Sequence, residues 1–592
     1  MRARRPIVLS MPTRKISDPS AEATPSGRPS ETLLRGRACY ERGEWNDAFE
    51  SLALEDESQP LDLDDLHRLA WAAGLTARDE QMLATQERLY HRYLESGQDL
   101  AAARASFWIS FRLLARGEGA RASGWLSRAQ HLIDLHAQDC VEQGYLLLPV
   151  AQRHINSREL EQASQCAERA FAIGERFAER DLIAFARNLQ GRVLIAQGRV
   201  DQGLSRLDES MVAATSGELS PVVTGIVYCS SIVSCHRVFA LDRVREWTVA
   251  LTEWCTAHPQ LGMFTGQCLV HRAEVMELAG SWAEAVDEAR RAVQRCVRDI
   301  ERDAAGRAHY LQAEIHRVRG EFDLAESAYR EASRCGFEPQ PGLALLRLAQ
   351  DDVDAAASAS RRMIAATREH LARTRFLPAH VEIMLANGDV DEARAASREL
   401  EEAAATLNTD VLHAIAAHAV GSVNLAAGNA QAVLDPVRRA FEFWQQLGAP
   451  YLAARLRVLL ARACAALADV EGARLELECA FEVFERLGAR PDVAAVESLM
   501  ANLDDSGKGA ARRTHGLTER ELQVLRLIAS GKTNKAIARE LHRRGALLDE
   551  VRSFVEAHDR SGQVASRGAA YAAATGATSG KSPMPAQNLH GY

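Results

Sequence analysis

The segment LAGSWAEAVDEARRA, residues 278–292, decides the fold. Gly280 favours the left-handed conformation that ends a helix, and the polar and acidic residues after it suit the start of the next helix. Ala285 follows the glycine by five residues, and Ala289 and Ala292 lie four and seven residues further on. This spacing places three small side chains on one face of a helix, where a second helix can cross closely. The segment therefore predicts the turn and the second helix of a helical hairpin.

The same pattern recurs through the middle of the chain. From Gly280 onward the copies begin near residues 320, 351, 388, 428 and 468, with a period of about forty. A single hairpin cannot bury its apolar face alone, so neighbouring hairpins must stack. We expect about ten or eleven hairpins over residues 31–500. Six further clear copies each follow a glycine: Gly43, Gly117, Gly198, Gly320, Gly388 and Gly428. One more copy, residues 466–480, has no glycine at its turn.

This pattern resembles the tetratricopeptide-like solenoids of large bacterial regulators, and the resemblance covers most of the chain. It implies a concave groove that takes a protein partner, a peptide or a small-molecule effector. The segment GFEPQPG at residues 336–342 interrupts the pattern and is the predicted break between two halves of the solenoid. Two interpretations stay open for four tryptophans, which either line the groove or pack in the core: Trp71, Trp108, Trp247 and Trp254.

The composition bounds the function. Hydrophobic residues make up 47% of the chain and charged residues 26%, which is typical of a soluble globular protein. The formal net charge is −9, so any contact with nucleic acid must be local. No apolar run is long enough to span a membrane, and the eleven cysteines show no zinc-ligand spacing. We therefore expect a cytoplasmic protein with reduced thiols, no metal site, no cofactor and no membrane contact.

A short domain follows the repeats. Residues 1–30 are expected to be disordered, residues 501–515 form a polar linker, and residues 576–592 form a disordered tail. Between them lies GLTERELQVLRLIASGKTNKAIARELH, residues 516–542. Thr518 and Glu521 form a capping box, and Gly531 ends the helix that they begin. A second helix starts near Thr533 or Asn534, so the segment predicts the first two helices of a helix-turn-helix.

This segment resembles the C-terminal DNA-binding domain of LuxR-type transcription regulators, which have a NarL/FixJ-like helix-turn-helix. The family begins with an LTxRE phrase and continues through a GxSNKxIA phrase. Ten residues match position by position: Leu517, Thr518, Arg520, Glu521, Gly531, Asn534, Lys535, Ile537, Ala538 and Leu541. Together, the two resemblances imply an all-α chain, with a tetratricopeptide-like helical-hairpin solenoid followed by a small helix-turn-helix domain over residues 516–575.

The second half of this domain departs from the family. About three extra residues precede the segment around Val551 that resembles the recognition helix. Glu550 and Phe554 stand where the family has threonine and histidine, and Asp549 adds a second negative charge. These carboxylates suit a helix N-terminus but repel DNA phosphates. Either this stretch is a genuine divergence, or it reflects a local reading-frame error in the source sequence.

Charge still favours DNA as the partner of this domain. Residues 512–567 hold twelve Lys or Arg and seven Asp or Glu, a net charge of +5. Arg552 and Ser553 are the candidates for base readout, and five basic residues are candidates for phosphate contacts: Lys532, Lys535, Arg539, Arg543 and Arg544. The resemblance adds Thr518, Thr533 and Asn534 to the DNA-binding set.

Three functions follow from these features. The first is a transcriptional regulator that binds double-stranded DNA as a homodimer and senses a ligand or protein partner through its solenoid. The second is a protein-interaction scaffold whose helix-turn-helix no longer binds DNA. The third, an enzyme, lacks any recognisable catalytic motif, so we predict that the chain is not an enzyme.

Overall fold

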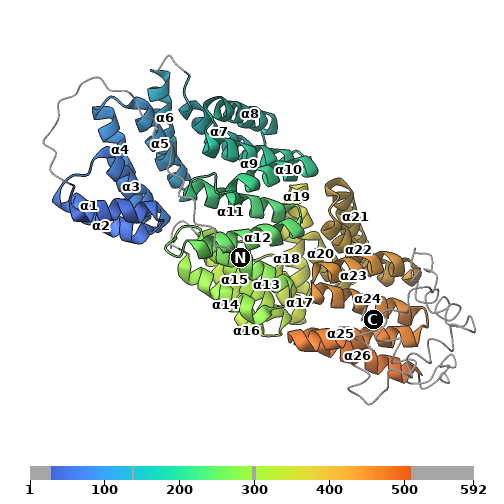
Figure 1. The fold of residues 1–592 in the computed structure, drawn as a ribbon. Helices are drawn as coiled ribbons and strands as arrows, with labels where there is room; N and C mark the ends of the chain where they lie inside the picture. The colour runs from blue at the N-terminus through green and yellow to red at the C-terminus, as the bar shows by residue number, and fades with distance from the viewer. Residues whose placement is uncertain (1–28, 136–138, 297–301, 508–592) are drawn as a thin grey trace, which may run out of the picture. The chain divides into compact units, whose positions relative to one another are not determined.

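The computed structural model describes residues 29–135, 139–296 and 302–507, and these residues form helices and turns without a strand. Figure 1 shows the helices in chain order. They are α1 (Glu31–Glu41), α2 (Trp45–Ser58), α3 (Leu63–Leu75), α4 (Asp79–Glu95), α5 (Asp99–Ala115), α6 (Gly119–Asp134), α7 (Glu142–Asn156), α8 (Leu160–Phe177), α9 (Arg180–Ala196), α10 (Val200–Thr215), α11 (Pro221–Arg237), α12 (Leu241–Ala257), α13 (Thr265–Leu278), α14 (Trp282–Arg295), α15 (Arg302–Val318), α16 (Phe322–Arg334), α17 (Gly342–Ala349), α18 (Val353–Ala366), α19 (His370–Thr374), α20 (Leu377–Ala386), α21 (Val390–Leu407), α22 (Asp410–Ala426), the 3-10 helix η1 (Ala430–Val433), α23 (Leu434–Leu447), α24 (Pro450–Ala466), α25 (Val470–Leu487) and α26 (Arg490–Gly507).

Helices that follow one another in the chain pack against one another. In the first part of the chain α1 contacts α2, α2 contacts α3 and α3 contacts α4, and the same order continues through α14. Near the other end α23, α24, α25 and α26 contact one another in sequence. The fold class is therefore the predicted one, an all-α stack of tetratricopeptide-like helical hairpins.

The turns inside the hairpins explain the period of about forty residues. Each turn holds one residue with a positive φ, and eight of the eleven intervals between these residues are 40 or 41. Nine of the twelve lie at or near the positions expected from the sequence. The twelve are Gly43, Ala77, Gly117, Arg158, Gly198, Phe239, Gly280, Gly320, Asp351, Gly388, Gly428 and Ala468.

The expected number of ten or eleven hairpins is corrected by this series, since the described residues hold twelve such turns. Ala77, Arg158 and Phe239 adopt positive φ values of 61°, 62° and 60° without being glycine. In this left-handed backbone conformation the Cβ of a non-glycine residue causes strain, so glycine is the residue expected there. The sequence at these three positions therefore does not predict a turn. Packing of the helices on either side must hold these three turns in place.

The small residues five positions after the turns lie in the core, as the sequence predicts. Ala48, Ala285 and Ala325 are each fully buried. Ala325 packs with Ala313 and Leu346, so α15, α16 and α17 share one apolar cluster. Small side chains at these positions let the two helices of a hairpin approach closely.

The described residues divide into two compact units. The first runs to Arg317 and also includes Phe322–Leu346 and Ala405–Val411, and the second includes Val318–Glu321, Arg347–Ala404 and the residues from Leu412 onward. The predicted break at 336–342 therefore lies within the first unit, close to its edge. Helix α26 continues to Gly507, seven residues into the segment that the sequence suggested as a linker.

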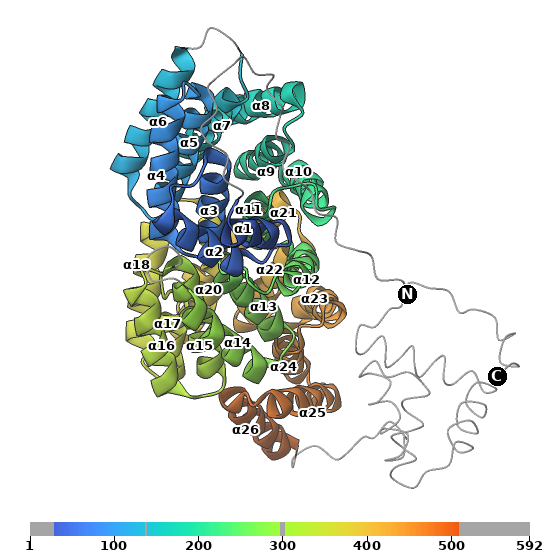
Figure 2. The ribbon, with the colours of Figure 1, turned by 60° about the vertical axis from the view of Figure 1, so that its left-hand side comes forward.

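Within the first unit, the loop between α12 and α13 returns to the first hairpins. The backbone N–H groups of Gly262 and Met263 both donate to the carbonyl oxygen of Leu75, at 2.8 and 3.0 Å. Gln260 accepts from the N–H of Asn46, 214 positions earlier in the chain, at 2.8 Å. Figure 2 shows the dark-blue first helices beside the green helices α11 to α13. This part of the solenoid is therefore fixed by contacts distant in sequence, in addition to those between neighbouring hairpins.

Two further expectations concern thiols and membranes. All eleven cysteines are free, five of them buried and six half-buried. None of the described helices combines the length and the apolar character needed to cross a membrane.

Candidate functional site

The ten predicted DNA-contact residues lie outside the described residues, so their roles stay predictions. They are Thr518, Lys532, Thr533, Asn534, Lys535, Arg539, Arg543, Arg544, Arg552 and Ser553.

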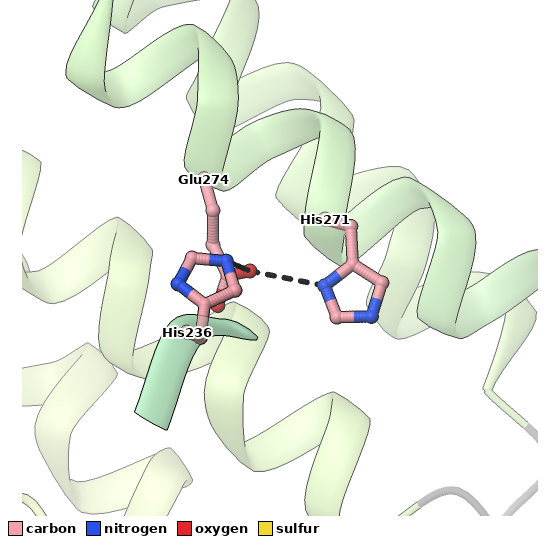
Figure 3. A group of neighbouring side chains, drawn as sticks. All are labelled: His236, His271 and Glu274. Carbon is pink, nitrogen blue, oxygen red and sulfur yellow. Dashed lines mark hydrogen bonds and ion pairs between the residues drawn. The ribbon is translucent and has the colours of Figure 1, made fainter. Parts of the chain in front are cut away.

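Within the first compact unit, three consecutive hairpins bring together a cluster of titratable side chains, and Figure 3 draws three of them, His236, His271 and Glu274. His271 and Glu274 lie three positions apart on α13, and this spacing places them on the same helical face. His236 comes from the last turn of α11, which packs against α13. Arg307 comes from α15. We call these four side chains the His–Glu cluster.

Glu274 is the centre of the His–Glu cluster. Its Oε2 lies 3.1 Å from Nε2 of His236 and 3.1 Å from Nδ1 of His271. Its Oε1 lies 3.3 Å from Nη1 of Arg307. The two imidazole rings lie nearly parallel, with centroids 6.2 Å apart. One carboxylate oxygen therefore faces both histidines, and the other faces the guanidinium.

Burial and neighbouring charged groups together determine which groups of this cluster are ionised. Burial alone raises the pKa of Glu274, but the positive charges of His236 and Arg307 and the hydrogen bonds from both histidines outweigh it and hold that pKa well below its usual range. The side chain of His271 is fully buried, and this burial lowers the pKa of its imidazole despite the neighbouring carboxylate. We therefore expect an ionised Glu274 beside a neutral His271 at neutral pH.

A second hydrogen bond fixes the far side of His271. Its Nε2 lies 3.1 Å from the side-chain amide nitrogen of Gln267, one turn earlier on α13. An amide offers both a donor and an acceptor, so Gln267 satisfies Nε2 in either tautomer of the imidazole. The direction in which the amide points determines whether Nδ1 of His271 carries the proton or a free electron pair.

Further acidic groups line α13 and α15 next to the cluster. Burial, together with the negative charges of Glu314 and Glu274, raises the pKa of Glu277 to about 8. Arg317 donates to Oε2 of Glu314 at 2.7 Å, and the hydroxyl of Tyr329 donates to its other oxygen. A Cβ on the residue at Gly342 would collide with this carboxylate and the tyrosine ring. The surroundings are thus polar, densely packed and rich in carboxylates.

The His–Glu cluster was not among the site residues that sequence reasoning named. The only local signal is the H-x-x-E spacing of residues 271–274, which is common on helices and weak by itself. His236 lies one hairpin earlier, and its approach depends on how α11 packs against α13. Two imidazole nitrogens and a carboxylate oxygen are ligand types that zinc prefers, and together with Arg307 they also make a neutralised polar network.

The four tryptophans divide between two environments. Trp71 and Trp108 are buried and meet edge to face with ring centroids 4.9 Å apart, so they pack in the core. Trp247 and Trp254 are half-buried. The indole N–H of Trp71 donates to Nε2 of His67 at 2.9 Å.

The second compact unit has a polar hollow of about 630 Å³ lined from α18 to α21. Arg361 and Arg373 lie in its wall together with Glu392 and Glu399. Arg361 pairs with Glu392 at 2.8 Å and with Asp389, and Arg373 pairs with Glu399. Carboxylates thus pair with these two arginines, and Arg368 also lines the hollow.

Comparison with known proteins tests the C-terminal segment directly. Residues 515–542 match the model of bacterial regulatory proteins of the luxR family. This match confirms the resemblance stated from the LTxRE and GxSNKxIA phrases. The luxR-family segment ends at His542, where the predicted departures from the family begin.

Solved structures with a similar arrangement are helical-repeat proteins. The APC/C hetero-tetramer Cut9-Hcn1 is 12% identical over 79% of this chain and 96% of its own, with a TM-score of 0.34. Yeast Tom70 is 11% identical over 81% and 96%, with a TM-score of 0.29. The apo form of the quorum sensor NprR from B. thuringiensis is 12% identical over 64% and 98%, with a TM-score of 0.34. Identities and TM-scores this low support no conclusion about ligand or function. No curated protein sequence matches the chain.

Proposed function

We propose that this chain is a cytoplasmic transcriptional regulator. Its helical-repeat solenoid binds a ligand or a protein partner, and residues 516–575 bind double-stranded DNA as a homodimer. The observation that carries the proposal is the luxR-family match over residues 515–542, which falls on the segment whose sequence predicts a capping box and two short helices.

The charge distribution supports DNA as the partner of the luxR-family segment. Residues 512–567 carry a net charge of +5, while the whole chain carries −9, which leaves about −14 on the remainder. A polyanion is therefore attracted to this region and repelled by the rest of the chain. Lys535 and Arg539 lie within the matched segment and are the first candidates for phosphate contacts.

The solenoid supports a sensing role because its helices pack mainly against their neighbours in the chain. A ligand shifts a conformational equilibrium only if it binds one state more tightly than the other. Stacked hairpins offer such states, because a small rotation at each interface changes the whole array. We infer that occupancy of the solenoid changes how the two DNA-binding regions of the dimer are presented.

A second function, a protein-interaction scaffold without DNA binding, is favoured by one observation. The family match stops at His542, and Asp549 and Glu550 follow where the recognition helix should begin. Two carboxylates at that point oppose the approach of phosphates. The two functions share the solenoid and differ only in DNA affinity.

Fluorescence anisotropy distinguishes the two functions. The full chain is titrated against labelled DNA from its own upstream region, and against a scrambled duplex, at several salt concentrations. A regulator gives a logarithm of affinity that falls with the logarithm of salt by about 0.9 for each phosphate contact. The double variant Lys535→Ala, Arg539→Ala should lower this slope by about 1.8, since two contacts are lost.

The control replaces a basic residue far from the luxR-family segment. Arg330 lies on α16 with an exposed side chain, and Arg330→Ala should leave the DNA affinity and its salt slope unchanged. No binding of either duplex at low salt would reject the regulator and leave the scaffold. Equal affinity for the two duplexes would show nonspecific binding only, and would also reject a sequence-specific regulator.

A further inference from the structure

We propose that His236, His271 and Glu274 form a binding site for a divalent transition-metal ion, with zinc as the best match. The proposal is independent of DNA binding, because it rests only on side chains of the solenoid. Its basis is the convergence of two imidazole nitrogens and one carboxylate oxygen from two consecutive hairpins.

The spacing of the three ligand atoms fits zinc. Zn–N and Zn–O bonds of about 2.0–2.1 Å in a tetrahedral site place neighbouring ligand atoms about 3.3 Å apart. Oε2 of Glu274 lies 3.1 Å from the facing nitrogen of each histidine. All three atoms lie within 4.8 Å of one another. The two nitrogens are therefore at most 4.8 Å apart, and the partly exposed imidazole of His236 would turn toward His271 to reach the tetrahedral spacing.

The groups behind the ligands are those that a metal site needs. A histidine ligand holds its other ring nitrogen in a hydrogen bond, which orients the ring and fixes the tautomer. Gln267 makes this contact with Nε2 of His271. The structure places the amide nitrogen of Gln267 at this position. Metal binding would turn the amide so that its carbonyl oxygen accepts from Nε2–H and Nδ1 presents an electron pair to the metal. Arg307 likewise holds Oε1 of the glutamate and leaves Oε2 for the metal.

Two further carboxyl groups lie near the proposed ligands. Glu277 follows on the next turn of α13, and Glu314 lies on α15. Burial first, and then the negative charges of Glu314 and Glu274, raise the pKa of Glu277 to about 8, and a cation bound nearby would favour its ionised form.

The three side chains would leave a fourth coordination position without a protein ligand. The side chain of His236 is 25% exposed and that of Glu274 is 14% exposed, while His271 is fully buried. Three protein ligands with an open fourth position bind a water molecule or a donor group of another molecule. A metal here would also tie α11 to α13 and so stiffen two consecutive hairpins.

Isothermal titration calorimetry of the full chain with zinc chloride tests the site. The two variants are His236→Gln and Glu274→Gln, and the control is His131→Gln on α6, where the histidine is exposed. We expect one tight zinc ion per chain, affinity at least about tenfold weaker in both site variants, and no change in the control. Absence of a tight ion, or equal affinity in all four proteins, would overturn the proposal.

Cobalt(II) separates this site from zinc bound by the free thiols. The wild-type complex should show visible d–d bands without a thiolate-to-cobalt charge-transfer band, and both site variants should lose these d–d bands. A dominant thiolate band would assign the ion to cysteines and overturn the proposal. Modification of the histidines in the wild-type protein gives a readout that needs no variant to fold. Zinc should protect His236 from diethyl pyrocarbonate and leave His131 reactive, whereas equal modification with and without zinc would refute the site.

Discussion

Replacing Gly262 by alanine should detach the α12–α13 loop from the first hairpins. A Cβ at this position would lie 2.7 Å from the carbonyl carbon of Thr76 and 2.8 Å from its oxygen. Both are backbone atoms, so no side-chain rotation relieves the clash. Gly262 also donates its N–H to Leu75 at 2.8 Å, and Met263 donates to the same oxygen. The loop must therefore move away from the turn that follows α3.

The cost follows from two terms. Overpacking against a rigid neighbour costs about 1–3 kcal/mol, and each weakened backbone hydrogen bond costs about 0.5–1.5 kcal/mol. With two such bonds affected, we expect Gly262→Ala to destabilise the first compact unit by about 2–6 kcal/mol.

A matched substitution isolates the steric effect. Gly124 lies inside α6, is exposed, and has no atom within 4 Å of an added Cβ. Gly124→Ala should stabilise the protein by about 0.5–1 kcal/mol, because alanine restricts the unfolded chain and suits a helix. Urea unfolding gives the free energies of both variants, and hydrogen exchange over residues 45–58 and 258–264 locates the change. A Gly262→Ala protein as stable as wild type, with unchanged exchange in these segments, would refute the closed contact.

Three further substitutions or conditions test other parts of the fold. Ala285→Leu should lower the melting temperature markedly, since the alanine is fully buried where α14 packs against α13, and unchanged melting would contradict the close crossing. Ala468→Gly should raise the free energy of unfolding by up to about 1 kcal/mol, because this exposed residue holds a φ of 64°. His67 has a pKa lowered to about 4, mainly by burial, and its neutral Nε2 accepts from Trp71. The unfolded chain then binds more protons than the folded chain between pH 6.5 and about 4, so the free energy of unfolding should fall as the pH falls through this window. The melting temperature should depend less steeply on pH in His67→Gln than in the wild type, and equal slopes in the two proteins would exclude this role.

The repeat architecture is readable from the sequence because it depends on local chemistry. Gly280 and Gly320 end helices, and Ala285 and Ala325 occupy the crossings five residues later, as the pattern predicts. The turn at Phe239 escaped prediction because a bulky residue holds a conformation that usually requires glycine. There the packing of two helices overrides the local preference.

The His–Glu cluster and the α12–α13 contact could not be derived in this way. His236 meets Glu274 only because α11 and α13 come from successive hairpins that pack together. Gln260 meets Asn46 across 214 positions, which depends on the accumulated rotation of several hairpins. Sequence spacing fixes the hairpin, but small angles between hairpins fix these distant contacts. The luxR-family segment could be identified from the sequence, because its matching residues lie in one contiguous stretch, which the family model also matches.

The central claim is that the chain regulates transcription by binding DNA through residues 516–575. The most direct measurement is DNase I footprinting of the full chain on its own upstream region. The regulator should protect a two-fold symmetric site with half-sites about one helical turn apart, and the variant Lys535→Ala, Arg539→Ala should lose that protection. If the folded protein protects no part of the upstream region at any protein concentration tested, the claim is contradicted.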